Sequence, residues 1–142
     1  MTNKIDTYKL AMELVRWCKK NKCWDGVVIY FNGKAWSSQS SWPSIYEPEV
    51  EGKKIGYDLY EYADRNPKDY FSSAKEPNIL SMSFEGELYR IINGYRSGST
   101  ALRRQLGEIF HDYGLYHHYG DAWNLTAYEK QEEDAMWDDW VF

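Results

Sequence analysis

The chain has 142 residues, close to the commonest size of a single domain and long enough to bury a core without disulfides or metals. With 43% hydrophobic and 27% charged residues, its composition is that of a globular protein and excludes a disordered chain. The formal net charge of −5 argues against direct nucleic-acid binding, because phosphate binding depends on clustered Lys and Arg. We therefore expect one cytoplasmic domain over residues 1–142, with no membrane span and no secretion signal.

The first predicted elements are a helix and a hairpin. Residues 7–20 have the apolar spacing of a helix that packs by one face, and Asp6 is placed to cap its first turn. Residues 27–31 and 34–38 are β-rich and are joined by Asn32-Gly33, a pair that accepts both positive φ angles of a type I′ turn. This pattern predicts a helix followed by a tight β-hairpin.

Residues 39–54 differ in character from what precedes them. They are rich in Ser and contain Pro43, Pro48 and Gly52, which predicts a long surface loop. Trp42 and Tyr46 make this segment too aromatic for a simple linker. Long loops in compact domains either dock through their own side chains or carry function, and we expect docking first.

Alternating patterns follow in residues 55–62 and 79–84. Each places apolar side chains at every second position, as a half-buried strand requires, although residues 55–62 also fit a helix. Between them, Pro67 and Pro77 with intervening polar residues predict turns or a short helix around residues 69–74.

Helical spacing returns at residues 88–95 and again after Ser99, which is placed to cap a helix that Gly114 would stop. Residues 115–128 then predict a second hairpin with Gly120-Asp121 at its turn. The order lacks regular βαβ alternation. We therefore predict an α+β fold whose mostly antiparallel sheet has two hairpins, with about three helices packed on one face.

No catalytic or metal-binding motif is apparent. His117 and His118 are adjacent, so on a strand they point to opposite faces and cannot chelate one ion together, and a site with His111 matches no zinc spacing. Cys18 and Cys23 have the spacing of neither a redox pair nor a zinc site, and we expect both to be reduced. We assign no catalytic residue, metal ligand or cofactor.

Arg96 and Ser99 form a weaker candidate site. They flank the start of the last predicted helix, where backbone amides can receive an anion. An ordinary turn between two helices is the alternative.

The C-terminal tail, residues 129–142, combines carboxylates with large aromatic rings. Aromatic side chains anchor interfaces, and acidic groups are drawn to basic surfaces. In a helix the tail's apolar residues would share one face, so we expect it to dock on folded protein: this chain, a twin subunit or a basic partner. The interaction candidates of the whole chain are Trp42, Tyr46, Trp137, Trp140, Phe142, Asp138 and Asp139.

Residues 78–89, together with Tyr113-Gly114-Leu115-Tyr116 and Ala122-Trp123-Asn124-Leu125, resemble small uncharacterised accessory proteins of bacterial mobile elements and phages. The resemblance covers about a third of the chain and contains no catalytic motif, so it transfers no functional residue. It implies an accessory role, including inhibition of a host nuclease or restriction system.

These observations favour a non-enzymatic protein-binding module that acts on a basic, nucleic-acid-handling partner. One alternative is a small hydrolase or ligand-binding enzyme with a cleft lined by Tyr, Glu and His. The other is a structural homodimer. A histidine within hydrogen-bond reach of a carboxylate in a cleft would favour the enzyme.

Overall fold

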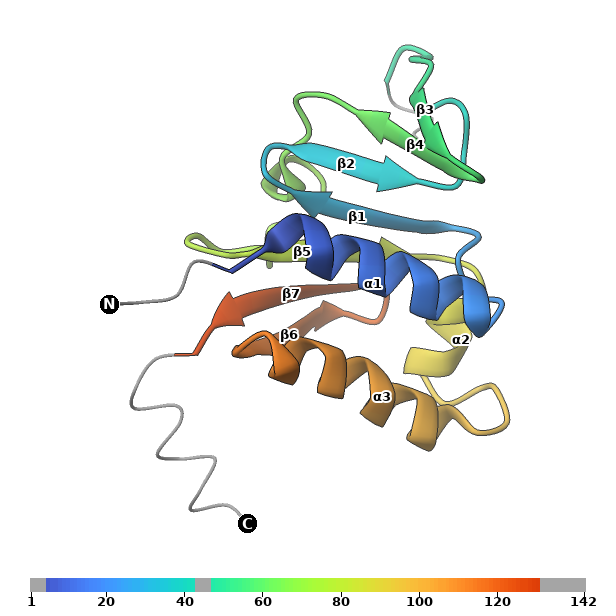
Figure 1. The fold of residues 1–142 in the computed structure, drawn as a ribbon, viewed down its shortest axis with the longest axis vertical. Coiled ribbons are helices and arrows are strands. Elements are labelled where there is room, and N and C mark those ends of the chain that lie inside the picture. Colours follow the sequence, from blue (N-terminus) through green and yellow to red (C-terminus); the bar gives the residue numbers. More distant parts are fainter. Residues whose placement is uncertain (1–4, 43–46, 131–142) are drawn as a thin grey trace.

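The computed structural model describes residues 5–42 and 47–130, which build a seven-stranded antiparallel sheet with helices on one face (Figure 1). The strand order is β3-β4-β2-β1-β5-β7-β6. In chain order the elements are α1 (Thr7–Lys20), β1 (Val27–Phe31), β2 (Lys34–Ser37), β3 (Lys53–Gly56), β4 (Leu59–Tyr62), a 3₁₀ turn η1 (Pro67–Asp69), β5 (Leu80–Phe84), α2 (Glu87–Ile92), α3 (Ser99–Asp112), β6 (Leu115–Asp121) and β7 (Asn124–Glu129). The predicted α+β class is confirmed.

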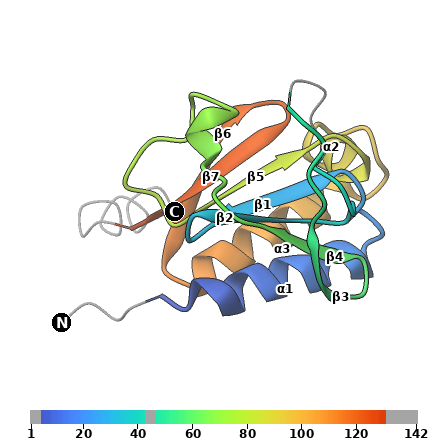
Figure 2. The same ribbon diagram turned by 90° about the horizontal axis from the view of Figure 1, so that it is seen from above.

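Helix α1 forms where its apolar spacing and its cap both require it. The Asp6 carboxylate accepts a hydrogen bond from the Lys9 backbone N–H at 3.0 Å, which satisfies one of the free donors of the first turn. Its apolar stripe is buried against the sheet, and α3 covers the same face further along (Figure 2). The expectation that the helices pack on one face is therefore confirmed.

The β1–β2 hairpin follows the turn chemistry of Asn32-Gly33. Both residues have positive φ, 51° at Asn32 and 76° at Gly33, as a type I′ turn requires. Pairing of Phe31 with Lys34 closes the hairpin directly across the turn.

Two strand boundaries differ from the sequence expectation. Residues 53–62 form a third hairpin, β3–β4, in place of one strand over 55–62, because Asp58 takes a positive φ of 49° and reverses the chain. In the last hairpin Asp121 still pairs with Asn124, so the turn lies at residues 122–123, beyond the expected Gly120-Asp121. In both places a local β-pattern could not show where the chain turns.

The sheet carries a core on each face. The helix-side core packs α1, α2 and α3 against alternate residues of the strands. A smaller cluster occupies the opposite face and is covered by two connections, the first described over residues 38–42 and 47–52 and the second over residues 63–79. Figure 2 shows the 3₁₀ turn of the second connection lying on the side opposite α1. This loop-covered face holds two pockets lined in part by aromatic side chains.

Candidate functional site

The loop-side cluster is the group of buried residues on the sheet face opposite the helices. Alternation along β1 and β2 directs Val28, Tyr30 and Ala35 to this face, while their neighbours face the helices. Strand β4 contributes Tyr62, and the connections contribute the remaining members. The whole cluster consists of Val28, Tyr30, Ala35, Trp42, Tyr62, Phe71 and Ala74.

Trp42 lies at the centre of this cluster. It is 6% exposed, and its ring packs edge-on against Tyr62 at 5.0 Å between centroids and in a tilted arrangement against Tyr70 at 5.4 Å. The Arg65 guanidinium lies 4.5 Å from the Trp42 ring centroid, a cation–π contact. Trp42 is therefore packed into the cluster and is not exposed as an interface anchor would be.

Residues 47–52 form an acidic arm at the edge of this face. Trp42 N–H donates to the Val50 carbonyl at 2.8 Å, and Gly52 N–H donates to the Ser40 carbonyl at 2.7 Å, so the arm returns beside residues 40–42. A β-bridge joins Ser41 to Glu51. In its described part, the expected loop over residues 39–54 thus contains two short segments, 40–42 and 50–52, that are hydrogen-bonded to each other. Its last two residues belong to β3.

Glu47 fixes the start of the acidic arm to the second connection. The Tyr70 hydroxyl donates to Glu47 Oε1 at 2.9 Å. Burial, reinforced by this bond to a carboxylate, raises the pKa of Tyr70 to about 12, so the hydroxyl keeps its proton and remains a donor. Beyond this anchor, Glu49, Val50 and Glu51 are exposed.

Gly52 fixes the other end of the acidic arm. A Cβ at this position would lie 2.7 Å from the Tyr62 ring and 2.8 Å from Cβ of Tyr60, so only glycine allows the arm to pass this close to β4. The arm is therefore held at both ends on rigid strands and turns.

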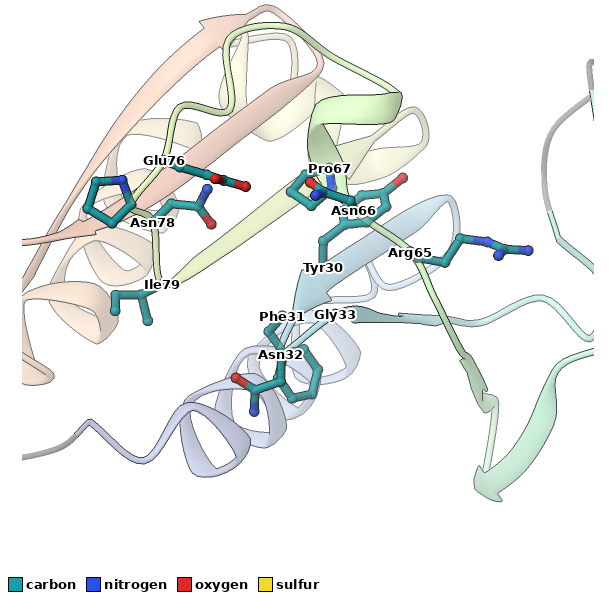
Figure 3. A pocket seen from close by; sticks show the side chains of 11 residues that line it. Tyr30, Phe31, Asn32, Gly33, Arg65, Asn66, Pro67, Glu76, Asn78 and Ile79 are labelled. Carbon is teal, nitrogen blue, oxygen red and sulfur yellow. The ribbon is translucent and has the colours of Figure 1, made fainter.

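A first pocket of about 660 Å³ opens where β1 ends and β5 begins. Figure 3 shows Glu76 and Asn78 on one wall and Asn66 with Pro67 on the other, where the Tyr30 ring lies beside them; Arg65 points away. The polar wall residues already have local partners: the Asn66 side chain caps the 3₁₀ turn, and Asn78 donates to the Lys75 carbonyl at 2.9 Å. This pocket therefore shows no converging set of polar groups.

A second pocket of about 160 Å³ lies on the other side of Tyr30. Val28, Tyr30, Ser37 and Ser83 on the strands form its floor, and the rim comes from separate connections. The rim consists of Gly26, Gln39, Trp42, Tyr70, Glu85 and Trp123. Trp42 Nε1 is buried and has no hydrogen-bond acceptor among the described residues.

The two residues of the predicted anion site already form hydrogen bonds with other groups of the protein. Arg96 donates through Nη1 to the Asn21 carbonyl at 2.8 Å and lies 3.9 Å from Glu87 Oε2, so its charge faces protein acceptors. Gly98, not Ser99, is the N-cap of α3, and the Ser99 hydroxyl donates to the Arg96 carbonyl. Arg96 therefore ties the α2–α3 connection to the C-terminal end of α1, while Ser99 bonds within that connection.

The histidines do not form the arrangement that the enzyme alternative requires. His117 faces the helices and stacks on Phe110 with ring centroids 5.3 Å apart, while His118 is exposed. His111 Nδ1 lies 2.9 Å from Lys130 Nζ. Among residues 5–42 and 47–130, no hydrogen bond joins a histidine to a carboxylate, and no group of three acidic, His or Cys side chains is arranged to hold a metal ion.

Most predicted interaction residues lie outside the described residues: Tyr46, Trp137, Trp140, Phe142, Asp138 and Asp139. Conversely, the pocket residues Tyr30, Tyr70 and Trp123 were not singled out from the sequence. Alternation in residues 27–31 marks Tyr30 as facing away from its apolar neighbours, but nothing in the sequence indicates that Tyr70 and Trp123 meet it.

No protein family, curated protein or solved structure matches this chain. In the part of the chain that the structure describes, no helix has both the length and the apolar character needed to cross a bilayer.

Proposed function

We propose that this chain is a non-enzymatic protein-binding module whose acidic arm contacts a basic segment of its partner. The observation that carries the proposal is an exposed apolar side chain between exposed carboxylates on a firmly anchored arm: Val50, 41% exposed, lies between Glu49 and Glu51. Residues on loops held by a rigid scaffold are suited to recognition, and a negative rim attracts a positive partner.

The charge distribution supports this reading. The described residues contain 17 Asp and Glu against 16 Lys and Arg, so most of this body is electrically balanced. Against that background, residues 47–51 hold three glutamates and no basic residue. The remaining acidic excess lies in the sequence of residues 131–142, which contain five carboxylates. An accessory protein that engages a nucleic-acid-handling protein would use such local acidity to occupy the partner's phosphate-binding surface.

The test replaces Glu49 and Glu51 together by Lys and measures binding of an oligoarginine peptide by NMR titration. Reversing these two charges on the acidic arm should weaken binding of the peptide on the order of tenfold and abolish the chemical-shift changes in residues 47–52. Wild-type binding should weaken as salt is added, because the contact is exposed.

The matched control replaces Glu108 and Asp112 on α3 by Lys, which gives the same net charge on the helix side of the sheet. This control should bind the peptide as the wild type does. If both double variants lose affinity equally, the peptide senses only total charge and the acidic arm is not the contact.

A further inference from the structure

We propose that the second pocket, between the β1–β2–β5 floor and the rim of Trp42, Tyr70 and Trp123, binds one neutral pyranose ring of a carbohydrate. This role is separate from protein binding by the acidic arm. The pocket has a volume of about 160 Å³, and a cavity of about 150 Å³ holds one benzene molecule, so the pocket has room for one six-membered ring whose substituents extend toward the exposed rim. Its size therefore selects one ring.

The polar groups around the pocket suit hydroxyl groups. Trp42 is 94% buried, since only 6% is exposed, and its Nε1–H lacks an acceptor in the described part of the chain. A buried donor without a partner costs about 1–3 kcal/mol, so an acceptor supplied by a ligand would be stabilising. Ser37 and Ser83 lie on the floor, and the exposed Gln39 and Glu85 stand at the rim. Amides, carboxylates and serines together can both donate to and accept from hydroxyl groups.

Two other ligand classes fit the pocket less well, anions because of charge and alkylammonium ions because of the arrangement of the aromatic rings. Among the residues that the structure describes, no Lys, Arg or His lines the pocket, while Glu85 does, so a phosphate or carboxylate ligand would be repelled without compensation. An alkylammonium ligand is held by a cage of several open aromatic faces, but the Trp42 ring is already engaged by the Arg65 guanidinium, and Trp123 alone does not form a cage. An uncharged ligand meets neither obstacle.

Ring geometry argues against a flat heterocycle. Tyr30, Trp42 and Tyr70 touch one another, with centroid separations of 5.4 to 6.3 Å, and the Tyr30 and Trp42 rings are inclined by 80°. These contacts leave no slot between two parallel rings in which a nucleobase could stack. A pyranose needs only one aromatic face, and Trp123, 37% exposed at the rim, can provide it.

The pocket also continues outward. A shallow hollow of about 400 Å³ is lined by Glu85, Tyr89 and Trp123, and it shares Glu85 and Trp123 with the pocket. A bound ring could therefore be a free monosaccharide or the end of a longer chain whose next unit lies in this hollow. Both sources present the same chemistry to the pocket.

The experiment records the indole N–H signals of Trp42 and Trp123 by NMR while the full chain is titrated with glucose, galactose, mannose and N-acetylglucosamine. The signals are assigned with Trp42→Phe and Trp123→Phe. We expect at least one pyranose to shift both signals in a saturable manner. Tighter binding of maltotriose or chitotriose than of its monosaccharide indicates a chain end, and equal binding indicates a free sugar.

A Gln39→Ala/Glu85→Ala variant keeps the buried aromatic residues and should weaken sugar binding on the order of fivefold or more. Glu108→Ala, on the opposite side of the sheet, should bind as the wild type does. The proposal is overturned if no pyranose shifts either signal, if only choline or adenosine does, or if the double variant binds sugar with unchanged affinity.

Discussion

At the scale of single residues, burial decides what each polar or aromatic side chain can do. Trp42 has the chemistry of an interface anchor, yet its packing on Tyr62 and Tyr70 makes it part of a core. His117 has the chemistry of an acid–base catalyst, yet it is stacked on Phe110. Burial, and to a smaller extent His118, lowers the pKa of His117, so the folded state favours the neutral ring.

The lowered pKa of His117 predicts a pH-dependent loss of stability. As the pH falls through the unfolded-state pKa of about 6.5, the unfolded chain takes up a proton that the folded chain resists, so the free energy of unfolding decreases. Replacing His117 by Phe keeps an aromatic ring against Phe110 and removes the titration. Urea unfolding at about pH 7.5 and about pH 5.5 should show a smaller loss for His117→Phe than for the wild type. Equal losses in the two proteins would contradict this explanation.

At the scale of elements, the sequence alone predicts a boundary where neighbouring residues have a strong preference for a helix cap or a tight turn. Asp6 caps α1, and Asn32-Gly33 forms the β1–β2 turn, both as the sequence predicts. The β3–β4 hairpin was missed because no comparable pair marks its turn, which instead uses Asp58 at positive φ. The hydrophobic alternation of residues 55–62 is compatible with one strand or with two halves of a hairpin.

Gly33 provides a test of turn coding at this scale. No atom lies within 4 Å of a Cβ built at Gly33, so Gly33→Ala introduces no clash and acts only through its φ of 76°. Placing an L-residue in this region should cost roughly 1–2 kcal/mol in free energy of unfolding. Asn32→Gly is the matched control and should stay within about 0.5 kcal/mol of the wild type. Denaturant midpoints measure both, and an undiminished midpoint for Gly33→Ala would show that the turn tolerates another conformation.

At the scale of the whole molecule, the two faces of the sheet have different roles. The helices bury one face in a continuous core, while two connections cover the other and leave pockets beside Tyr30. The two sheet edges also differ. β3 is short and carries Lys53 and Lys54, which discourages pairing with another strand, whereas β6 is seven residues long and contains neither Lys nor Pro.

The C-terminal tail, residues 129–142, provides the test at molecular scale, since we expect it to dock on folded protein. A chain ending at Gln131 should then have a smaller free energy of unfolding or a smaller oligomeric state than the full chain. The reason is that Trp137, Trp140 and Phe142 would no longer bury apolar area. If the tail docks within one chain, the truncated chain should have a lower unfolding midpoint than the full chain at every protein concentration. If it docks between twin subunits, sedimentation equilibrium should show the full chain as a dimer and the truncated chain as a monomer. Equal midpoints and equal numbers of subunits in the two proteins would contradict docking within the chain and docking between twin subunits, and would leave only docking on a separate partner.

The sequence by itself determined the fold class, α1 with its cap and the Asn32-Gly33 hairpin, because period and turn chemistry act between residues close in the chain. Only the tertiary structure decided that Trp42, Tyr70 and Trp123 meet over Tyr30 and that the acidic arm is held on β4. Those residues come from three separate connections, and their meeting depends on strand order and register, which no local pattern encodes.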